Sequence, residues 1–124
     1  MDNLIIPKAK STLGVNFNAS NGECLLEGSS FPENTSDFFK PITDWLVKYM
    51  LEVTGKVTLN LKFDYLNSSS IKFISDITDR LQAYHNAGAE VELKWYYDEN
   101  DEDILEMGQE LKEDLNFPFN LIMK

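Results

Sequence analysis

The sequence predicts a single α/β domain in which one mixed sheet begins with a β-hairpin and carries helices packed on it. Apolar and polar residues alternate over residues 57–64 and 91–97, which is typical of strands. Between and after these stretches, apolar residues recur every three or four positions, which is typical of amphipathic helices. Strand–helix–strand units imply parallel pairing with right-handed crossovers. The 124 residues suffice for one domain, and we expect residues 1–12 to be an extended, loosely held N-terminus.

The first third of the chain predicts a hairpin and a helix. Apolar stretches at residues 13–17 and 24–28 flank Asn21-Gly22, a strong hairpin signal because both residues tolerate positive φ. Residues 29–34 are interpreted as a connection. One helical face then contains Phe38, Ile42, Trp45, Leu46, Tyr49 and Val53. Proline disfavours a helix interior, so we expect a short turn, a main helix with Pro41 in its first turn, and a stop at Gly55.

The remainder predicts three strands and two helices. The strand at residues 57–64 is followed by Asn67-Ser68-Ser69-Ser70, which opens a helix that Gly88 ends. In the strand at residues 91–97, Trp95 and Tyr97 face one side and Tyr96 the other. An acidic run at residues 98–103 leads into a third helix. Residues 117–123 are predicted as a last edge strand, since proline is tolerated only at an edge or a strand start.

Charge and composition exclude several classes of partner. Eleven Lys and Arg residues against 21 Asp and Glu give a formal net charge of −10. This argues against nucleic acid and anionic membrane surfaces, and suits a basic protein partner. No apolar run approaches the ~20 residues of a membrane span, so we expect no membrane insertion. Without a secretory signal pattern, the cytoplasm is the expected compartment.

The sequence offers little for catalysis, metals or cofactors. A single cysteine, Cys24, excludes a disulfide framework and a cysteine-rich metal site. No phosphate-binding glycine motif occurs, so no cofactor is expected. Residues 98–109 resemble a calcium loop, but Asp103 and Gln109 stand where glycine and glutamate are required, so no metal is expected. A small enzyme that uses Ser69, Lys72 and the acidic run is the disfavoured alternative, because its motif match is weak and His85 is the only histidine.

The stretch Asn67-Ser68-Ser69-Ser70 is the most informative feature. It lies between an apolar strand and an amphipathic helix, so Asn67 or Ser68 is expected to cap that helix. Capping needs one residue, whereas this stretch supplies four polar ones. The alternative is a phosphoacceptor, because a phosphate adds about −1.5 to −2 charges and accepts hydrogen bonds from free amides.

Several blocks of sequence, in order, resemble the SiaC family of bacterial regulatory phosphoproteins. The blocks are Phe31-Pro32-Glu33-Asn34, Phe38-Phe39-Lys40-Pro41, Trp45-Leu46, Tyr65-Leu66-Asn67-Ser68-Ser69-Ser70, residues 95–103 and Phe117-Pro118-Phe119. The resemblance covers the chain from about Leu13 onward. It implies a fold like the STAS domain of anti-sigma-factor antagonists, which agrees with the predicted element order.

The resemblance also implies a function. Unphosphorylated members bind and activate a diguanylate cyclase, which raises cyclic di-GMP and promotes biofilm formation. A dedicated Ser/Thr kinase adds the phosphate and a PP2C-type phosphatase removes it. The phosphoacceptor falls on Ser68, where threonine is commoner, with Ser69 as the second choice and Asn67, Ser69 and Ser70 as its surroundings. An anti-sigma-factor-antagonist-type switch acting on another target is the alternative.

The role of the acidic run is left open by the resemblance. Acidic residues at the start of a helix complement its dipole, which accounts for such a run without any partner. The alternative is a docking patch for a basic partner. The candidate docking residues are Tyr96, Asp98, Glu99, Asp101, Glu102 and Asp103.

Overall fold

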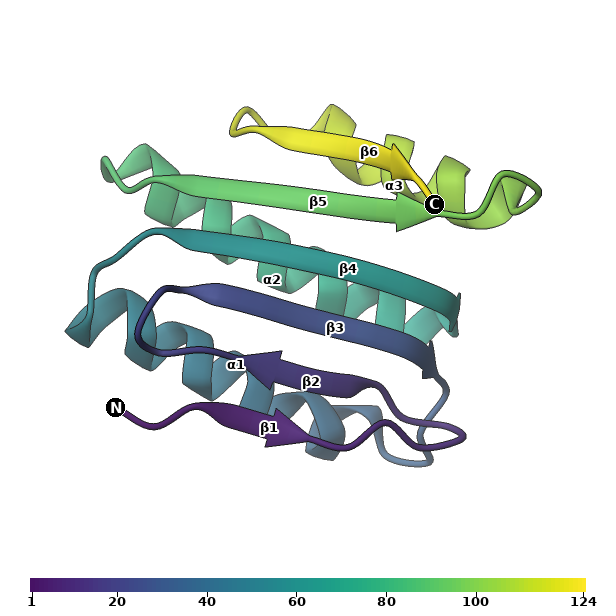
Figure 1. Ribbon diagram of the computed structural model, residues 1–124, viewed down its shortest axis with the longest axis horizontal. Helices are drawn as coiled ribbons and strands as arrows, with labels where there is room; N and C mark the ends of the chain where they lie inside the picture. Colours follow the sequence, from purple (N-terminus) through teal and green to yellow (C-terminus); the bar gives the residue numbers. More distant parts are fainter.

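Six strands form one mixed sheet in which the order across the sheet is the order along the chain. The computed structural model describes residues 1–124 (Figure 1). The elements are β1 (Leu4–Ile6), β2 (Gly14–Phe17), β3 (Glu23–Ser30), α1 (Thr35–Glu52), β4 (Val57–Leu66), α2 (Ser68–Asn86), β5 (Val91–Tyr97), α3 (Glu102–Glu113) and β6 (Phe119–Met123). The predicted single α/β domain is confirmed, as are the hairpin of β2 and β3 and the edge strand β6.

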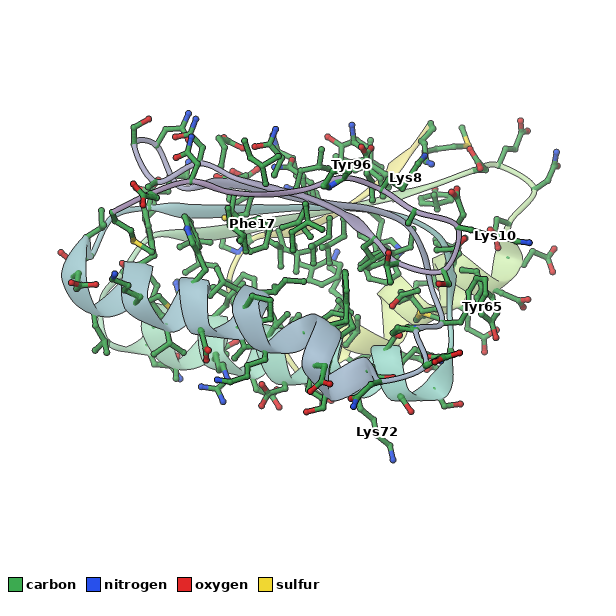
Figure 2. All side chains as sticks on the ribbon, turned by 90° about the horizontal axis from the view of Figure 1, so that it is seen from below. Lys8, Lys10, Phe17, Tyr65, Lys72 and Tyr96 are labelled. Carbon is green, nitrogen blue, oxygen red and sulfur yellow. The ribbon has the colours of Figure 1, made fainter.

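The topology leaves one face of the sheet without helices. β1, β2 and β3 pair antiparallel, whereas β3, β4, β5 and β6 pair parallel. One helix connects each strand of the parallel part to the next. Because these crossovers have the same handedness and proceed across the sheet in the same direction, their helices lie on the same side of the sheet. All three helices accordingly lie behind the sheet in Figure 1 and below it in Figure 2. All three helices begin at the end of the sheet where the parallel strands have their carboxyl ends.

The core fills the space between the sheet and the three helices. Twenty-four buried apolar residues form one cluster. In β4, Val57, Leu59, Leu61 and Phe63 point into it, as their alternation predicted. Trp95 of β5 is fully buried, and its Nε1 donates a hydrogen bond to the Ile104 carbonyl of α3 at 2.9 Å. No helix combines the length and apolar character that a membrane crossing requires.

The N-terminus is held more firmly than expected. Leu4–Ile6 pair with β2 as the edge strand β1. The indole Nε1 of Trp45 donates to the Asp2 carbonyl at 2.8 Å, and the Ala19 amide donates to the Asn3 side chain at 2.8 Å. The expected loose N-terminus over residues 1–12 is therefore wrong for residues 2–6. The short strand gives too little sequence signal to be predicted before its pairing partner is known.

The first helix differs from the prediction at both ends. It runs without a break from Thr35, with Pro41 inside it and not in its first turn. Pro41 and Asp37, whose carbonyl lacks the usual N–H partner, are both exposed, so water can hydrate that carbonyl. The left-handed residue after the helix is Thr54, with φ of 54°, and not Gly55. Ser29 and Ser30 belong to β3 and not to the connection that follows it.

Candidate functional site

The turn from β4 into α2 is fixed by its first residue, Asn67. The Asn67 side chain accepts a hydrogen bond from the Ser70 amide at 2.9 Å, so Asn67 is the N-cap of α2. It is one of the two residues that were expected to cap this helix. Its own amide donates to the Ser30 carbonyl at the end of β3, also at 2.9 Å. Asn67 therefore ties the start of α2 to the neighbouring strand and determines where the three serines point.

The side chain of Ser70 is part of the protein interior. Its side chain is fully buried, and its Oγ lies 2.7 Å from the Oγ of Ser30, which is also fully buried. The Ser70 hydroxyl also donates to the Ser30 carbonyl at 3.2 Å. Since that hydroxyl is both enclosed and hydrogen-bonded, it cannot reach a phosphate donor. The side chains of Ser68 and Ser69 are exposed, so the structure leaves these two as the accessible hydroxyls of the stretch.

An exposed aromatic pair lies next to this turn. Tyr65 is 53% exposed and Phe31 is 43% exposed, and their rings meet edge to face with centroids 6.0 Å apart. Both residues lie at the carboxyl ends of adjacent parallel strands. Tyr65 is labelled at the end of the molecule where α1 and α2 begin (Figure 2). An apolar patch of this kind beside an accessible hydroxyl is suited to contact with another protein.

A β-bulge turns Tyr65 outward. Gly28 pairs with Phe63 but Ser29 pairs with Tyr65, so Asp64 is an extra residue in β4. Simple alternation from Phe63 would place Tyr65 in the core, whereas the bulge exposes it and buries Leu66. Sequence reasoning did not single out this pair. Its only signal was that the strand pattern stops at Asp64 while aromatic and apolar residues continue.

The acidic run is largely explained by the helix it precedes. The Asp101 side chain accepts from the Ile104 amide at 3.1 Å and caps α3, while Glu102 and Asp103 lie in the first turn. An Asp98 carboxylate oxygen lies 4.0 Å from the Lys124 Nζ. Nowhere does the chain bring three His, Cys, Asp or Glu side chains into an arrangement that could hold a metal ion. The run lies at the same edge of the sheet as Ser68.

Tyr96 lies on a different surface from Ser68. It projects from the face of the sheet that carries no helix, where the Lys62 Nζ lies 4.8 Å from its ring centroid (Figure 2). Ser68 belongs to α2, on the other side of the sheet. Ser68, Tyr65 and the acidic run therefore lie where the parallel strands end. Tyr96 is only two residues before Asp98, but its side chain is on the face of the sheet that carries no helix.

The single histidine and the single cysteine lie away from Ser69 and Lys72, the serine and lysine of the enzymatic alternative. His85 is in the last turn of α2 with its ring 6.1 Å from that of Phe117, whereas Ser69 and Lys72 are in the first turns of the same helix. Cys24 is fully buried, and burial together with the charge of Glu23 raises the pKa of its thiol far above the usual value. Neither group is placed to activate the hydroxyl of Ser69.

Comparison with known proteins agrees with this geometry. A family model described as "SiaC family regulatory phosphoprotein" matches residues 6–124. The chain belongs to the SiaC family. A protein of Pseudomonas aeruginosa strain UCBPP-PA14, named only as uncharacterized protein PA14_02130, is 36% identical over 119 residues, which cover 96% of this chain and 94% of the relative.

Solved structures of SiaC itself are also close in fold. SiaC of Pseudomonas aeruginosa is 34% identical with a TM-score of 0.94, and the match covers 100% of both chains. A second structure is described as the diguanylate cyclase SiaD in complex with its activator SiaC, from the same species. Its matching chain is 35% identical with a TM-score of 0.94, covering 98% of this chain and 99% of that one. This chain is thus a member of a family of regulatory phosphoproteins that act in signalling.

Proposed function

We propose that this chain is a phosphorylation-controlled adaptor whose unphosphorylated form binds and activates a diguanylate cyclase, raising cyclic di-GMP and promoting biofilm formation. A dedicated Ser/Thr kinase phosphorylates Ser68, and a PP2C-type phosphatase removes the phosphate. The observation that carries the proposal is the contrast within one turn, where Ser68 is exposed beside the Phe31–Tyr65 pair while Ser70 is buried. The choice of target is supported by the related SiaC of Pseudomonas aeruginosa, which has been solved as an activator in complex with the diguanylate cyclase SiaD.

The physical basis of the switch is local. The Phe31–Tyr65 pair offers apolar surface that a partner can cover. A phosphate on Ser68 brings about −1.5 to −2 charges to the rim of that surface. Burying such a charge without a compensating partner is costly, so a partner that fits the unmodified surface is released. The fold itself need not change, because the hydrogen bonds of Asn67 and Ser70 already fix the turn on the neighbouring strand β3.

Intact-mass analysis and phosphopeptide mapping of the protein from its native cells test the modification. We expect a single phosphate on Ser68 in a fraction of the molecules, absent in Ser68→Ala. Ser69→Ala is the matched control and should retain the phosphate. Quantitative phosphorylation of Ser68→Ala would contradict the assignment and point to Ser69.

Capture of partners by the immobilised chain tests the target. The unmodified chain and Ser68→Ala should both retain a diguanylate cyclase and increase its rate of cyclic di-GMP synthesis from GTP. Ser68→Asp should weaken both effects. The weakening should be partial, because one carboxylate carries less charge than a phosphate. Retention of an anti-sigma factor with no cyclase would overturn the proposed target in favour of the anti-sigma-factor-antagonist alternative.

A further inference from the structure

A row of charged and polar residues runs along the outside of α2 from Ser68. Lys72, Asp76 and Arg80 follow Ser68 at intervals of four residues, and all four side chains are exposed. Residues four apart in a helix lie one above the other on the same face. The row therefore reads hydroxyl, cation, anion, cation along one surface of the helix.

One cation in this row has no partner. Asp76 has Lys72 one turn before it and Arg80 one turn after it, and its carboxylate accepts from the Arg80 Nε at 2.9 Å. An acid that precedes a base by four residues is the more favourable order, which accounts for this choice. The ion pairs of the chain leave Lys72 without a carboxylate, as they leave Lys8, Lys10, Lys62, Lys94 and Lys112. Among these lysines, Lys72 is the one that lies one turn after Ser68 on α2. Its side chain points away from the body of the protein (Figure 2).

We infer that Lys72 is the counter-ion for a phosphate on Ser68. The phosphate stands one turn before Lys72, in the same acid-then-base order as Asp76 and Arg80. The Lys72 ammonium donates hydrogen bonds to phosphate oxygens, and the row becomes an alternating series of four charges. The presence of the phosphate rests on the proposed function. The pairing with Lys72 rests on the spacing of Ser68, Lys72, Asp76 and Arg80 along α2.

The pairing changes what a partner meets on α2. The unmodified surface offers a free cation at Lys72. With phosphate on Ser68, the pair of residues carries a net charge of about −0.5 to −1 and the ammonium is already occupied. A partner that uses Lys72 in the unmodified form therefore loses that contact when the phosphate arrives.

Phosphoserine placed at residue 68 of the full chain by genetic encoding allows a direct test that needs no kinase. The ³¹P chemical shift is followed against pH at low ionic strength in the wild type, Lys72→Arg and Lys72→Ala. The second ionisation of phosphoserine falls near pH 6. We expect its midpoint to be lower with Lys or Arg at residue 72 than with Ala, by roughly 0.1–0.4 pH unit for an ordinary pair one turn apart.

Two controls separate this pairing from a general effect of charge. Lys112→Ala removes an equally unpaired lysine from α3 and should leave the midpoint at the wild-type value. High salt should close the gap between wild type and Lys72→Ala, because an exposed pair is screened. The charge of Asp64, which is exposed just before the turn, acts alike in every variant. Equal midpoints in wild type and Lys72→Ala at low salt, or equal shifts in Lys72→Ala and Lys112→Ala, would overturn the inference.

The inference and the proposed function fail separately in these experiments. Absence of phosphate from Ser68 in native cells contradicts the proposed function. The titration uses phosphate already in place, so its outcome reports only on the pairing.

Discussion

The Oγ of Ser70 lies 2.7 Å from the Oγ of Ser30, and both side chains are fully buried where β3 ends and α2 begins. Forty residues separate the two serines in the chain. Together with the Asn67 amide, which donates to the Ser30 carbonyl, this contact fixes the first turn of α2 on the sheet. The accessible hydroxyls of Ser68 and Ser69 are presented from that fixed turn.

Ser70→Ala should therefore destabilise the protein without abolishing phosphorylation. It removes one partner of a buried hydroxyl pair and leaves the Ser30 hydroxyl unsatisfied, at a cost of about 1–3 kcal/mol in the free energy of unfolding. Urea denaturation measures this loss, and Ser69→Ala, at an exposed position, should stay within about 0.5 kcal/mol of wild type. The double variant Ser30→Ala/Ser70→Ala should cost less than the sum of the two single changes. Additive losses would show that the two hydroxyls do not act as a pair.

The order of the elements could be predicted from the sequence because its signals are local. The alternation in β4, the helical spacing in α2 and the turn at Asn21-Gly22 each lie within a few residues. The start of α1 before Pro41 was missed because the tertiary packing of the helix, on whose exposed side Asp37 and Pro41 lie, outweighs the local penalty. The left-handed conformation of Thr54 was missed because glycine is the usual residue in that conformation. Gly55 serves a different purpose, since a Cβ on Gly55 would come within 2.6 Å of the Tyr49 hydroxyl.

The candidate site could be predicted only in part, and for a similar reason. Ser68, Ser69 and Ser70 look alike in the sequence, and only the packing of α2 on β3 distinguishes the buried Ser70 from the other two. The exposed Tyr65 depends on a bulge whose extra residue, Asp64, is defined by pairing with β3. Contacts between residues distant in the chain decide both features.

Gly108→Ala should destabilise α3, in contrast to the usual gain of about 1 kcal/mol for this change inside a helix. A Cβ at Gly108 would lie 2.5 Å from the Trp95 indole, which is fully buried and cannot move away. Forced overpacking of this kind costs about 1–3 kcal/mol. Urea denaturation followed by tryptophan fluorescence measures the loss, with Gln109→Ala as the exposed control on the same helix. An unchanged or increased stability of Gly108→Ala would contradict this close packing.

Tyr65→Ala should weaken binding of the partner while leaving the fold intact. The side chain is half exposed, so its removal costs the folded protein little, but aromatic residues at the centre of an interface often contribute more than 1 kcal/mol to binding. The dissociation constant for the captured cyclase should rise at least about fivefold. Leu51→Ala is the matched control, because Leu51 is 76% exposed near the other end of α1. Equal effects of the two substitutions would argue against the Phe31–Tyr65 surface as the docking site.

Stability should fall at alkaline pH because of the buried Cys24. Burial raises the pKa of its thiol above the ordinary value of 9.0, with the charge of Glu23 acting in the same direction. Above about pH 9 the unfolded chain therefore loses this proton while the folded chain keeps it. The folded state then binds more protons, so the free energy of unfolding decreases as pH rises, by up to about 1.4 kcal/mol per pH unit for one thiol.

Urea denaturation at several values between about pH 8 and pH 10 measures this slope. The contribution of the thiol is complete below its ordinary pKa and is lost progressively above it. Burial also raises the pKa of Tyr49 and Tyr84 above 10.0, so these phenols steepen the loss only at the upper end of the range. Cys24→Ala should be less stable at every pH because it leaves a cavity, yet its slope between about pH 9 and pH 10 should be shallower than that of wild type. Parallel slopes would show that the thiol ionises alike in the folded and unfolded chains, which is incompatible with its complete burial.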